Sequence, residues 1–191
     1  MEDVLSGAER SALNGEIERL RGEVARLGER IEELDRVAHM DPLVPIANRR
    51  GLVRQLEISI ARRARHKTPS ALLFVDLDGL KMLNDSYGHG VGDAALVYIA
   101  EAMVRAVRRT DLVARLGGDE FAILLDHAEE ANAHDTAARL ANEVASCDFV
   151  HNGHALPLSI AIGFTMVAGD DDPEAVLERA DQAMYRDKAA A

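Results

Sequence analysis

Residues 112–125 read LVARLGGDEFAILL, in which two short apolar runs flank the tetrapeptide GGDE. Residues 112–116 and 121–125 have the length and the composition of β-strands. The two glycines between them can adopt the positive φ angles that a tight turn requires. The stretch therefore predicts a β-hairpin whose tip carries two adjacent acids, Asp119 and Glu120.

On either side of the hairpin, helical and strand-like patterns alternate. Residues 71–75 form a continuous apolar run, typical of a strand buried on both faces, which ends in Asp76-Leu77-Asp78. Asn152-Gly153 marks a turn between short strands that include residues 158–166. Helices are expected at 52–65, from Asp93 to Arg109, at about 130–145, and from Asp172-Pro173-Glu174 onward, where a capping aspartate precedes a proline. The expected fold class is α+β, with a mainly antiparallel sheet flanked by helices.

The acids gather where the predicted strands end. Asp76 and Asp78 are two residues apart, so their side chains point to one face of the sheet. If the hairpin lies beside their strand, Asp119 and Glu120 join them at one sheet edge. Carboxylates this close repel each other unless divalent cations lie among them, and ligands that are all oxygen suit Mg²⁺ or Mn²⁺. Such ions commonly assist in-line displacement at a phosphorus atom. When the hairpin is considered alone, the alternative interpretation is a solvent-exposed acidic turn.

The N-terminal segment follows a different pattern, a heptad repeat. Its apolar residues alternate in steps of four and three, at Leu13, Ile17, Leu20, Val24, Leu27, Ile31 and Leu34. β-branched residues at position a with leucine at d favour a parallel two-stranded coiled coil. An amphipathic helix folded back on its own domain is the alternative. Asp41-Pro42 ends the helix, because a residue before proline avoids the α region, so residues 1–40 are expected to form the coil and 41–191 a globular domain.

Composition and charge exclude several classes of protein. The net charge of -11 would repel a nucleic acid backbone, so no nucleic acid partner is expected. No apolar run approaches the roughly 20 residues that span a bilayer, and the start, Met1-Glu2-Asp3, is acidic where a signal peptide is basic. No membrane partner is expected either, and the expected location is the cytoplasm. The single cysteine, Cys147, cannot form an internal disulfide and is expected to be a buried thiol.

Residues 117–121, GGDEF, resemble the signature pentapeptide of the GGDEF family of diguanylate cyclases. The family's other motifs are matched in register by Asp41-Pro42-Leu43, Asn48-Arg49-Arg50, Asp76-Leu77-Asp78, Lys81, Asn84-Asp85, Gly88-His89, Gly92-Asp93 and Arg115-Leu116. The resemblance covers residues 41 to about 188. It implies a nucleotidyl cyclase or polymerase-palm type of sheet and a reaction that converts two GTP molecules into cyclic di-GMP and two pyrophosphates.

The resemblance also implies roles for the matching residues. Two divalent ions, Mg²⁺ or Mn²⁺, would be held in each half-site by Asp76, the backbone carbonyl of Leu77, Asp119 and Glu120. Glu120 would be either a ligand of the second metal or the base that takes the proton from the attacking 3′-hydroxyl. The implied substrate contacts are Asn84 and Asp93 at the guanine edge, His89 in the same pocket, Gly118 through its N–H, Lys188 at the phosphates, and Lys81 where charge builds on the phosphates.

A single domain would supply only half of the catalytic site, so the implied enzyme is a homodimer. The parallel coiled coil would hold the two domains together and raise their effective concentration, plausibly into the millimolar range. The alternative function is a non-catalytic module that binds GTP or cyclic di-GMP and signals through its coil. Such proteins generally carry a damaged signature, whereas this one is intact. A purely structural dimerisation module would leave the acids at the hairpin unexplained.

A second site is implied by Arg108-Arg109-Thr110-Asp111, which resembles the RxxD inhibitory motif and ends five residues before Gly117. Cyclic di-GMP would bind Arg108 and Asp111 as a feedback inhibitor, with Arg139 reaching the same ligand. The structural alternative is that arginines at a helix C-terminus favour the helix dipole and that an aspartate begins the next turn.

Two stretches depart from the family pattern. Residues 43–49 read LVPIANR where the family usually has LTGLPNR, so the opening loop is expected to have a different shape. The Gly-Arg-Asn that usually follows the last lysine is replaced by the three alanines of residues 189–191. One phosphate-binding arginine is therefore expected to be missing, with a cost in GTP affinity.

Overall fold

The computed structural model describes residues 7–146 and 149–190. Cys147, and with it the expectation of a buried thiol, lies outside the described residues. The chain divides into two compact units, the first ending at Ala38 and the second beginning at His39. This division lies next to the end of the heptad segment at Met40.

From residue 7 onward, the first unit is formed by one helix, α1 (Gly7–His39). Charged side chains pair along it, with Arg19 and Glu16 2.7 Å apart and Arg36 and Glu33 2.9 Å apart. The seven apolar heptad residues are all exposed in this chain, from 43% at Ile17 to 69% at Val24. Because packing of an apolar face supplies most of the stability of a helix in water, this seam is suited to a partner helix. No described helix is both long enough and apolar enough to cross a membrane.

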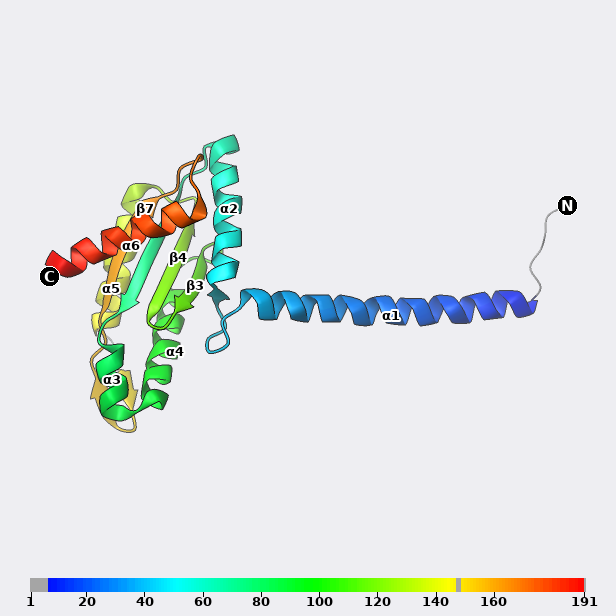
Figure 1. Cartoon of the computed structure of the whole chain (residues 1–191), viewed down its shortest axis with the longest axis horizontal. Coiled ribbons are helices and arrows are strands. Elements are labelled where there is room, and N and C mark those ends of the chain that lie inside the picture. The colour runs from blue at the N-terminus through cyan, green and yellow to red at the C-terminus, as the bar shows by residue number, and fades with distance from the viewer. Residues whose placement is uncertain (1–6, 147–148, 191) are drawn as a thin grey trace. The chain divides into compact units, whose positions relative to one another are not determined.

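The second unit is built on a five-stranded sheet in the order β1-β3-β4-β2-β7 (Figure 1). Its strands are β1 (Ala47–Asn48), β2 (Ser70–Leu77), β3 (Leu112–Gly117), β4 (Glu120–Asp126) and β7 (Ile160–Met166). β1 runs parallel to β3, whereas the other neighbouring pairs are antiparallel. The predicted GGDE hairpin is confirmed as β3 and β4, and the predicted α+β class with a mainly antiparallel sheet is confirmed with it.

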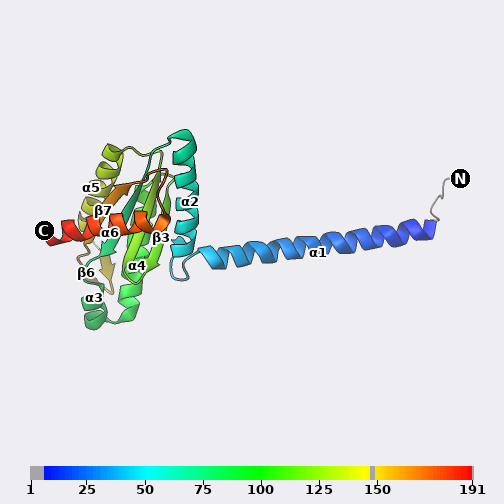
Figure 2. The ribbon, with the colours of Figure 1, turned by 45° about the horizontal axis from the view of Figure 1, so that its top comes forward.

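Helices cover both faces of the sheet and enclose two cores. α2 (Arg49–His66) and α6 (Pro173–Ala190) bury one face, to which β2 contributes Leu72 and Phe74. α4 (His89–Ala106) and α5 (Glu130–Ser146) bury the other, to which β2 contributes Leu73 and Val75. Figures 1 and 2 both show α6 lying across the strands. Since alternate residues of a strand point to opposite faces, Asp76 continues the row of Leu72 and Phe74 on the side of α6.

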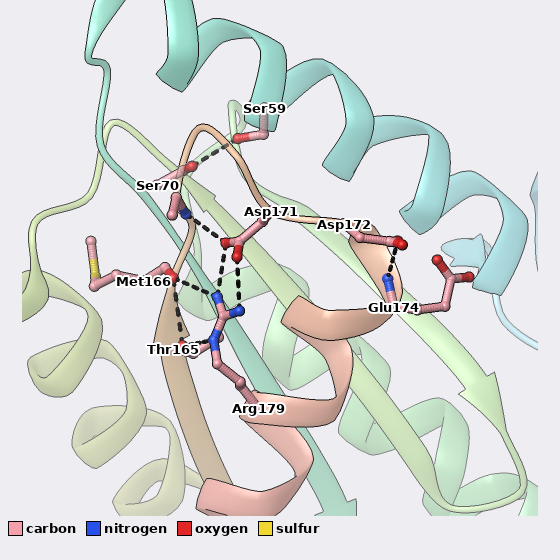
Figure 3. A network of polar contacts seen from close by, with 9 residues as sticks. Ser59, Ser70, Thr165, Met166, Asp171, Asp172, Glu174 and Arg179 are labelled. Carbon is pink, nitrogen blue, oxygen red and sulfur yellow. Dashed lines mark hydrogen bonds and ion pairs between the residues drawn. The ribbon is translucent and has the colours of Figure 1, made fainter.

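Two local sequence signals act as predicted. Asn152 and Gly153 join the small hairpin of β5 (Phe149–His151) and β6 (His154–Leu156), with φ angles of 50° and 80°. These are the two positive values of a type I′ turn. At the start of α6, the N–H of Glu174 donates to Asp172 Oδ1 at 3.1 Å, which confirms the aspartate cap (Figure 3). The strand expected within 158–166 begins at Ile160.

The region between β2 and β3 differs from the prediction. It holds two helices, α3 (Leu80–Tyr87) and α4, and α4 begins at His89 rather than Asp93 and ends at Ala106 rather than Arg109. The N-cap of α4 is Gly88, so Asp93 lies inside the helix and is not its cap. Three glycines in five residues lower the helix propensity of 88–92, which explains the error. The packing of α3 against α4 outweighs that penalty.

Candidate active site

The pairing of β2 with β4 brings acids from two distant stretches of chain to one end of the sheet. In this antiparallel register Asp76 lies directly opposite Glu120. Beyond the paired residues, the N–H of Leu77 donates to the carbonyl oxygen of Asp119 at 3.0 Å. Both strands are held in place by the apolar residues that they bury on the two sides of the sheet. The predicted convergence of these acids is therefore present in the fold.

The hairpin tip is fixed by an arginine that the sequence interpretation quoted only as part of the signature. Gly118 turns with a φ of 53°, and its carbonyl accepts from Arg115 Nη2 at 2.7 Å and from Nε at 3.1 Å. The same guanidinium reaches Asp41 Oδ1 at 3.4 Å, and the two side chains are only 14% and 10% exposed. Asp41 also accepts from the N–H groups of Leu43 and Val44. Arg115 thus ties the turn that carries Asp119 to the loop that opens the domain.

Lys188, on α6, lies against the acids of β2. Its ammonium contacts Asp76 Oδ1 and lies 2.8 Å from Asp78 Oδ1. These two carboxylates raise the pKa of Lys188 above its usual value. Asp78 is held in turn by the hydroxyl of Ser159, which donates to it at 2.9 Å. The lysine predicted to touch phosphate therefore lies against the carboxylates of β2 and the turn after it.

The placement of Lys188 depends on how α6 is attached to the sheet. Arg179 donates two hydrogen bonds to Asp171, each 2.8 Å long, and others to Thr165 Oγ1 and the carbonyl of Met166 (Figure 3). At Gly163 on β7, a Cβ atom would lie 1.9 Å from a backbone nitrogen of α6, so only glycine permits this approach. The helix is thereby seated directly on the strand beside β2.

Glu120 experiences the crowding of negative charge most directly. Its pKa is raised above the usual value, first by burial and then by the charges of Asp119, Asp181 and Asp76, while Arg49 opposes the shift. The sequence interpretation missed Asp181 and Arg49 as neighbours of this site. For Asp181 a signal existed, since it lies seven residues before Lys188 and hence on the same face of α6.

The ligand chemistry at this end of the sheet is all oxygen, as Mg²⁺ and Mn²⁺ prefer. The side chains of Asp76, Asp119 and Glu120 and the carbonyl of Leu77 are the predicted ligands. Among residues 7–146 and 149–190, no three His, Cys, Asp or Glu side chains already converge on one point that could hold a metal ion. The donors suit a divalent cation, but in the ligand-free arrangement Asp76 is engaged by Lys188.

The residues expected to bind guanine lie on α3 and α4. Asn84 on α3 contacts Gly92 on α4 so closely that a Cβ at Gly92 would lie 2.0 Å from Asn84 Oδ1. This oxygen is buried and has no hydrogen-bond partner within the described part of the chain. A buried acceptor without a donor is costly, and a ligand N–H would satisfy it. His89 and Asp93 are exposed on the first two turns of α4, and Lys81 is exposed on the first turn of α3.

The three residues of the predicted inhibitory site are also brought together, in a separate cavity. Arg108, Asp111 and Arg139 line a cavity of about 130 Å³ beside the end of α4. Asp111 Oδ2 accepts from the N–H of Arg108 at 2.8 Å, and Oδ1 accepts from the N–H of Asp126 at 3.0 Å. Arg139 donates to the carbonyl of Ala106 at 2.7 Å. Asp111 is therefore engaged by the backbone, while the two arginines contribute positive charge to the cavity wall.

Known proteins resemble this chain in sequence and in fold. Residues 38–191 match the family model described as "Diguanylate cyclase, GGDEF domain". Diguanylate cyclase DgcP of Pseudomonas aeruginosa is 38% identical over 160 residues, which are 84% of this chain and 24% of that protein. Diguanylate cyclase DosC of Escherichia coli is 37% identical over 164 residues, 85% of this chain and 36% of that protein. The chain thus spans between 24% and 36% of the length of these two relatives.

A solved structure covers both units of the chain. It is the crystal structure of the coiled coil and GGDEF domain of DgcB from Caulobacter crescentus in complex with c-di-GMP, with a TM-score of 0.86. The identity is 27%, and the match covers 94% of this chain and 96% of that one.

Proposed function

The chain belongs to the GGDEF family of diguanylate cyclase domains, and on that premise we propose that it condenses two GTP molecules into cyclic di-GMP and two pyrophosphates. The observation that carries this proposal is the register of β2 against β4, which sets Asp76 opposite Glu120 and Leu77 beside Asp119. In each of two steps, the 3′-oxygen of one GTP forms a bond to the α-phosphorus of the other, pyrophosphate leaves, and the proton of the 3′-hydroxyl passes to a base.

The acids at the end of the sheet would hold two divalent ions, Mg²⁺ or Mn²⁺. Asp76, the carbonyl of Leu77, Asp119 and Glu120 are the residues that would bind them. When bound, such ions neutralise phosphate charge and polarise the phosphorus under attack. Glu120 serves either as a ligand of the second ion or as the base for the 3′-hydroxyl. Arg115 has a positioning role, since it holds the turn that presents Asp119.

The remaining residues would bind and orient the nucleotide. Asn84 on α3 would contact the guanine edge, and Asp93 and His89 on the adjacent helix would complete the guanine site. Gly118 would donate its N–H to the nucleotide. Lys81 and Lys188 would interact with the phosphates, where their positive charge stabilises the charge that develops during transfer.

Catalysis by such half-sites requires two domains that face each other. The exposed heptad seam of α1 supports a parallel coiled-coil homodimer, and the related DgcB structure includes a coiled coil. Tethering in this way raises the local concentration of the second domain, to roughly the millimolar range. We expect the domain to work in the cytoplasm, where GTP is made.

Product inhibition is the second part of the proposal. Arg108, Asp111 and Arg139 line the same cavity, and the guanidinium groups of the two arginines could bind the phosphate oxygens of a phosphodiester. The c-di-GMP complex of DgcB supports a place for this ligand on a related domain. The cavity includes Leu125 and Asp126 at one end of β4, and the carboxylate site includes Glu120 at the other end, so binding at one need not block the other directly.

Anion-exchange chromatography of the protein incubated with GTP and Mg²⁺ tests the activity. We expect cyclic di-GMP and pyrophosphate to accumulate, and Asp119→Asn to abolish both. A protein that binds GTP but returns it unchanged would be the non-catalytic signalling module instead.

A further inference from the structure

Lys188 occupies a position that the proposed phosphate contact does not explain. Its ammonium touches Asp76, a proposed metal ligand, and lies 2.8 Å from Asp78. The same end of the sheet also gathers Glu120 and the charges of Asp119 and Asp181 that act on it. In the absence of ligand, the lysine therefore does part of the charge neutralisation that metal ions would do.

Lys188 and a divalent ion would compete for Asp76, because the ammonium already lies against its Oδ1. Both are attracted by the same carboxylate, and close together they repel each other. The part of the chain described by the structure shows no three potential ligands already arranged around a shared point, which fits a site in which Asp76 is engaged by a lysine. A metal ion at Asp76 must therefore either displace Lys188 from Oδ1 or bind the other oxygen against the repulsion of the nearby ammonium.

The lysine can leave without a movement of its helix. α6 is secured near its start by Arg179 and lies directly on Gly163 of β7. Lys188 stands near the other end of this helix, on a long side chain that is 42% exposed. Rotation of the side chain alone can carry the ammonium from the carboxylates toward a triphosphate.

We propose that Lys188 is a resident cation that competes with metal for Asp76, and that a nucleotide triphosphate ends the competition by giving the lysine a new partner. This inference rests on the proposed function, because it takes Asp76 as a metal ligand. It adds an order of binding to that function: the site has a low affinity for metal alone and a higher affinity for metal when a nucleotide is bound with it.

Titration of the full chain with Mn²⁺ alone, without nucleotide, tests the first half of the proposal. Calorimetry should show that Lys188→Met binds Mn²⁺ about 5- to 10-fold more tightly than the wild type, the range expected when partly exposed ion pairs no longer compete. Arg186→Met is the matched control. It removes the same charge from the same helix, and no ion pair of Arg186 is seen within the described residues. Equal affinities in Lys188→Met and the control would overturn the proposal.

The second half is tested with Mn²⁺ and 3′-deoxy-GTP, which lacks the attacking hydroxyl. Here Lys188→Met should bind the pair about 10-fold more weakly than the wild type, because a charged contact to phosphate is lost. The two effects have opposite signs, whereas local damage to α6 would weaken both. In an Asp76→Asn background the gain in Mn²⁺ affinity should vanish; a gain that persists would place the metal elsewhere and refute the competition.

These binding measurements are independent of turnover. If the wild type makes cyclic di-GMP but Lys188→Met binds Mn²⁺ no more tightly than the wild type does, only this inference is contradicted. Absence of cyclic di-GMP together with the predicted pair of opposite shifts contradicts the proposed activity and leaves the competition intact.

Discussion

The end of β2 and the cavity beside Arg108 are both built from aspartates and basic side chains, but they balance their charges in opposite ways. At the end of β2, Asp76 relies on one lysine, and neighbouring acids raise the pKa of Glu120. In the cavity, both oxygens of Asp111 accept backbone N–H groups, and Asp126, which also lines the cavity, is paired with Arg62. We proposed that the first region binds cations and that the second binds an anion, so the two regions should respond differently to substitution.

The largest expected effect comes from removing a carboxylate of the first region. Asp76→Asn should lower the rate of cyclic di-GMP synthesis by about 10³-fold, because loss of a metal ligand forfeits several kcal/mol of transition-state stabilisation. Turnover is measured by chromatography of initial-rate samples. Affinity for cyclic di-GMP, measured by calorimetry, should persist, since the cavity keeps its residues. The comparison fails if the variant stays within tenfold of the wild type.

Disrupting the coiled coil should lower turnover, which depends on the end of β2, and should leave the cavity beside Arg108 unaffected. We expect Leu20→Asp with Leu27→Asp to reduce turnover at nanomolar enzyme by about 100-fold and to restore it at high protein concentration, because the second domain must then be found by diffusion. Rates measured across enzyme concentration check this. Gly15→Asp with Gly22→Asp places the same charges on the outer face of α1, where an added side chain meets open space, and should behave as wild type. Equal losses in both double variants would contradict the coil.

A substitution in the cavity should weaken inhibition by cyclic di-GMP and leave turnover unchanged. Arg108→Ala should raise the inhibition constant for cyclic di-GMP by about 10- to 100-fold, which is the loss of one charged hydrogen-bonding partner. The constant is obtained from initial rates at increasing product. Arg109→Ala, the next residue in the same turn, is the control and should keep normal inhibition. Unaltered inhibition in the Arg108 variant would refute the site.

The smallest expected effect concerns the stability of the free protein. Glu120 has a raised pKa, so the folded state holds its proton more tightly than the unfolded state, and stability falls as pH rises from 4.5 through the folded pKa. Glu120→Gln should therefore increase the free energy of unfolding at pH 7 by less than about 1 kcal/mol, because solvent screens this side chain. The melting temperature should rise slightly with it. The gain should disappear toward pH 4. Thermal unfolding at both pH values measures it, and a lower melting temperature at pH 7 would contradict the charge crowding.

Asp111→Asn provides the contrast to that result. An amide cannot accept at both of its terminal atoms, so one of the two backbone hydrogen bonds is lost. The variant should be destabilised by about 1 kcal/mol. If Glu120→Gln and Asp111→Asn both stabilised the protein, the proposed difference in how the two regions balance their carboxylate charges would be wrong.

Much of the fold could be predicted because its signals are local. The hairpin at 112–125 follows from two apolar runs and two glycines, and the start of α6 follows from Asp172 and Pro173. The existence of α3 and the start of α4 could not be predicted. They depend on the packing of α3 against α4, which a local pattern does not show, in a stretch whose glycines oppose helix formation.

The site divides in the same way. The convergence of Asp76 with Glu120 could be predicted from strand alternation and an adjacent hairpin. The neighbour Arg49 could not, because it comes from a helix far from Glu120 in sequence and meets it only through packing, whereas Asp181 had a signal in its seven-residue spacing from Lys188. The contact of Lys188 with Asp76 instead of phosphate was equally beyond local patterns.

A crystal structure with Mn²⁺ and 3′-deoxy-GTP tests the central claim most directly, since anomalous scattering locates the metal. We expect manganese between Asp76 and the Asp119-Glu120 turn, the guanine at Asn84, and Lys188 moved from Asp76 to the phosphates. Manganese bound without Asp76, or a nucleotide bound away from the end of β2, would contradict the account.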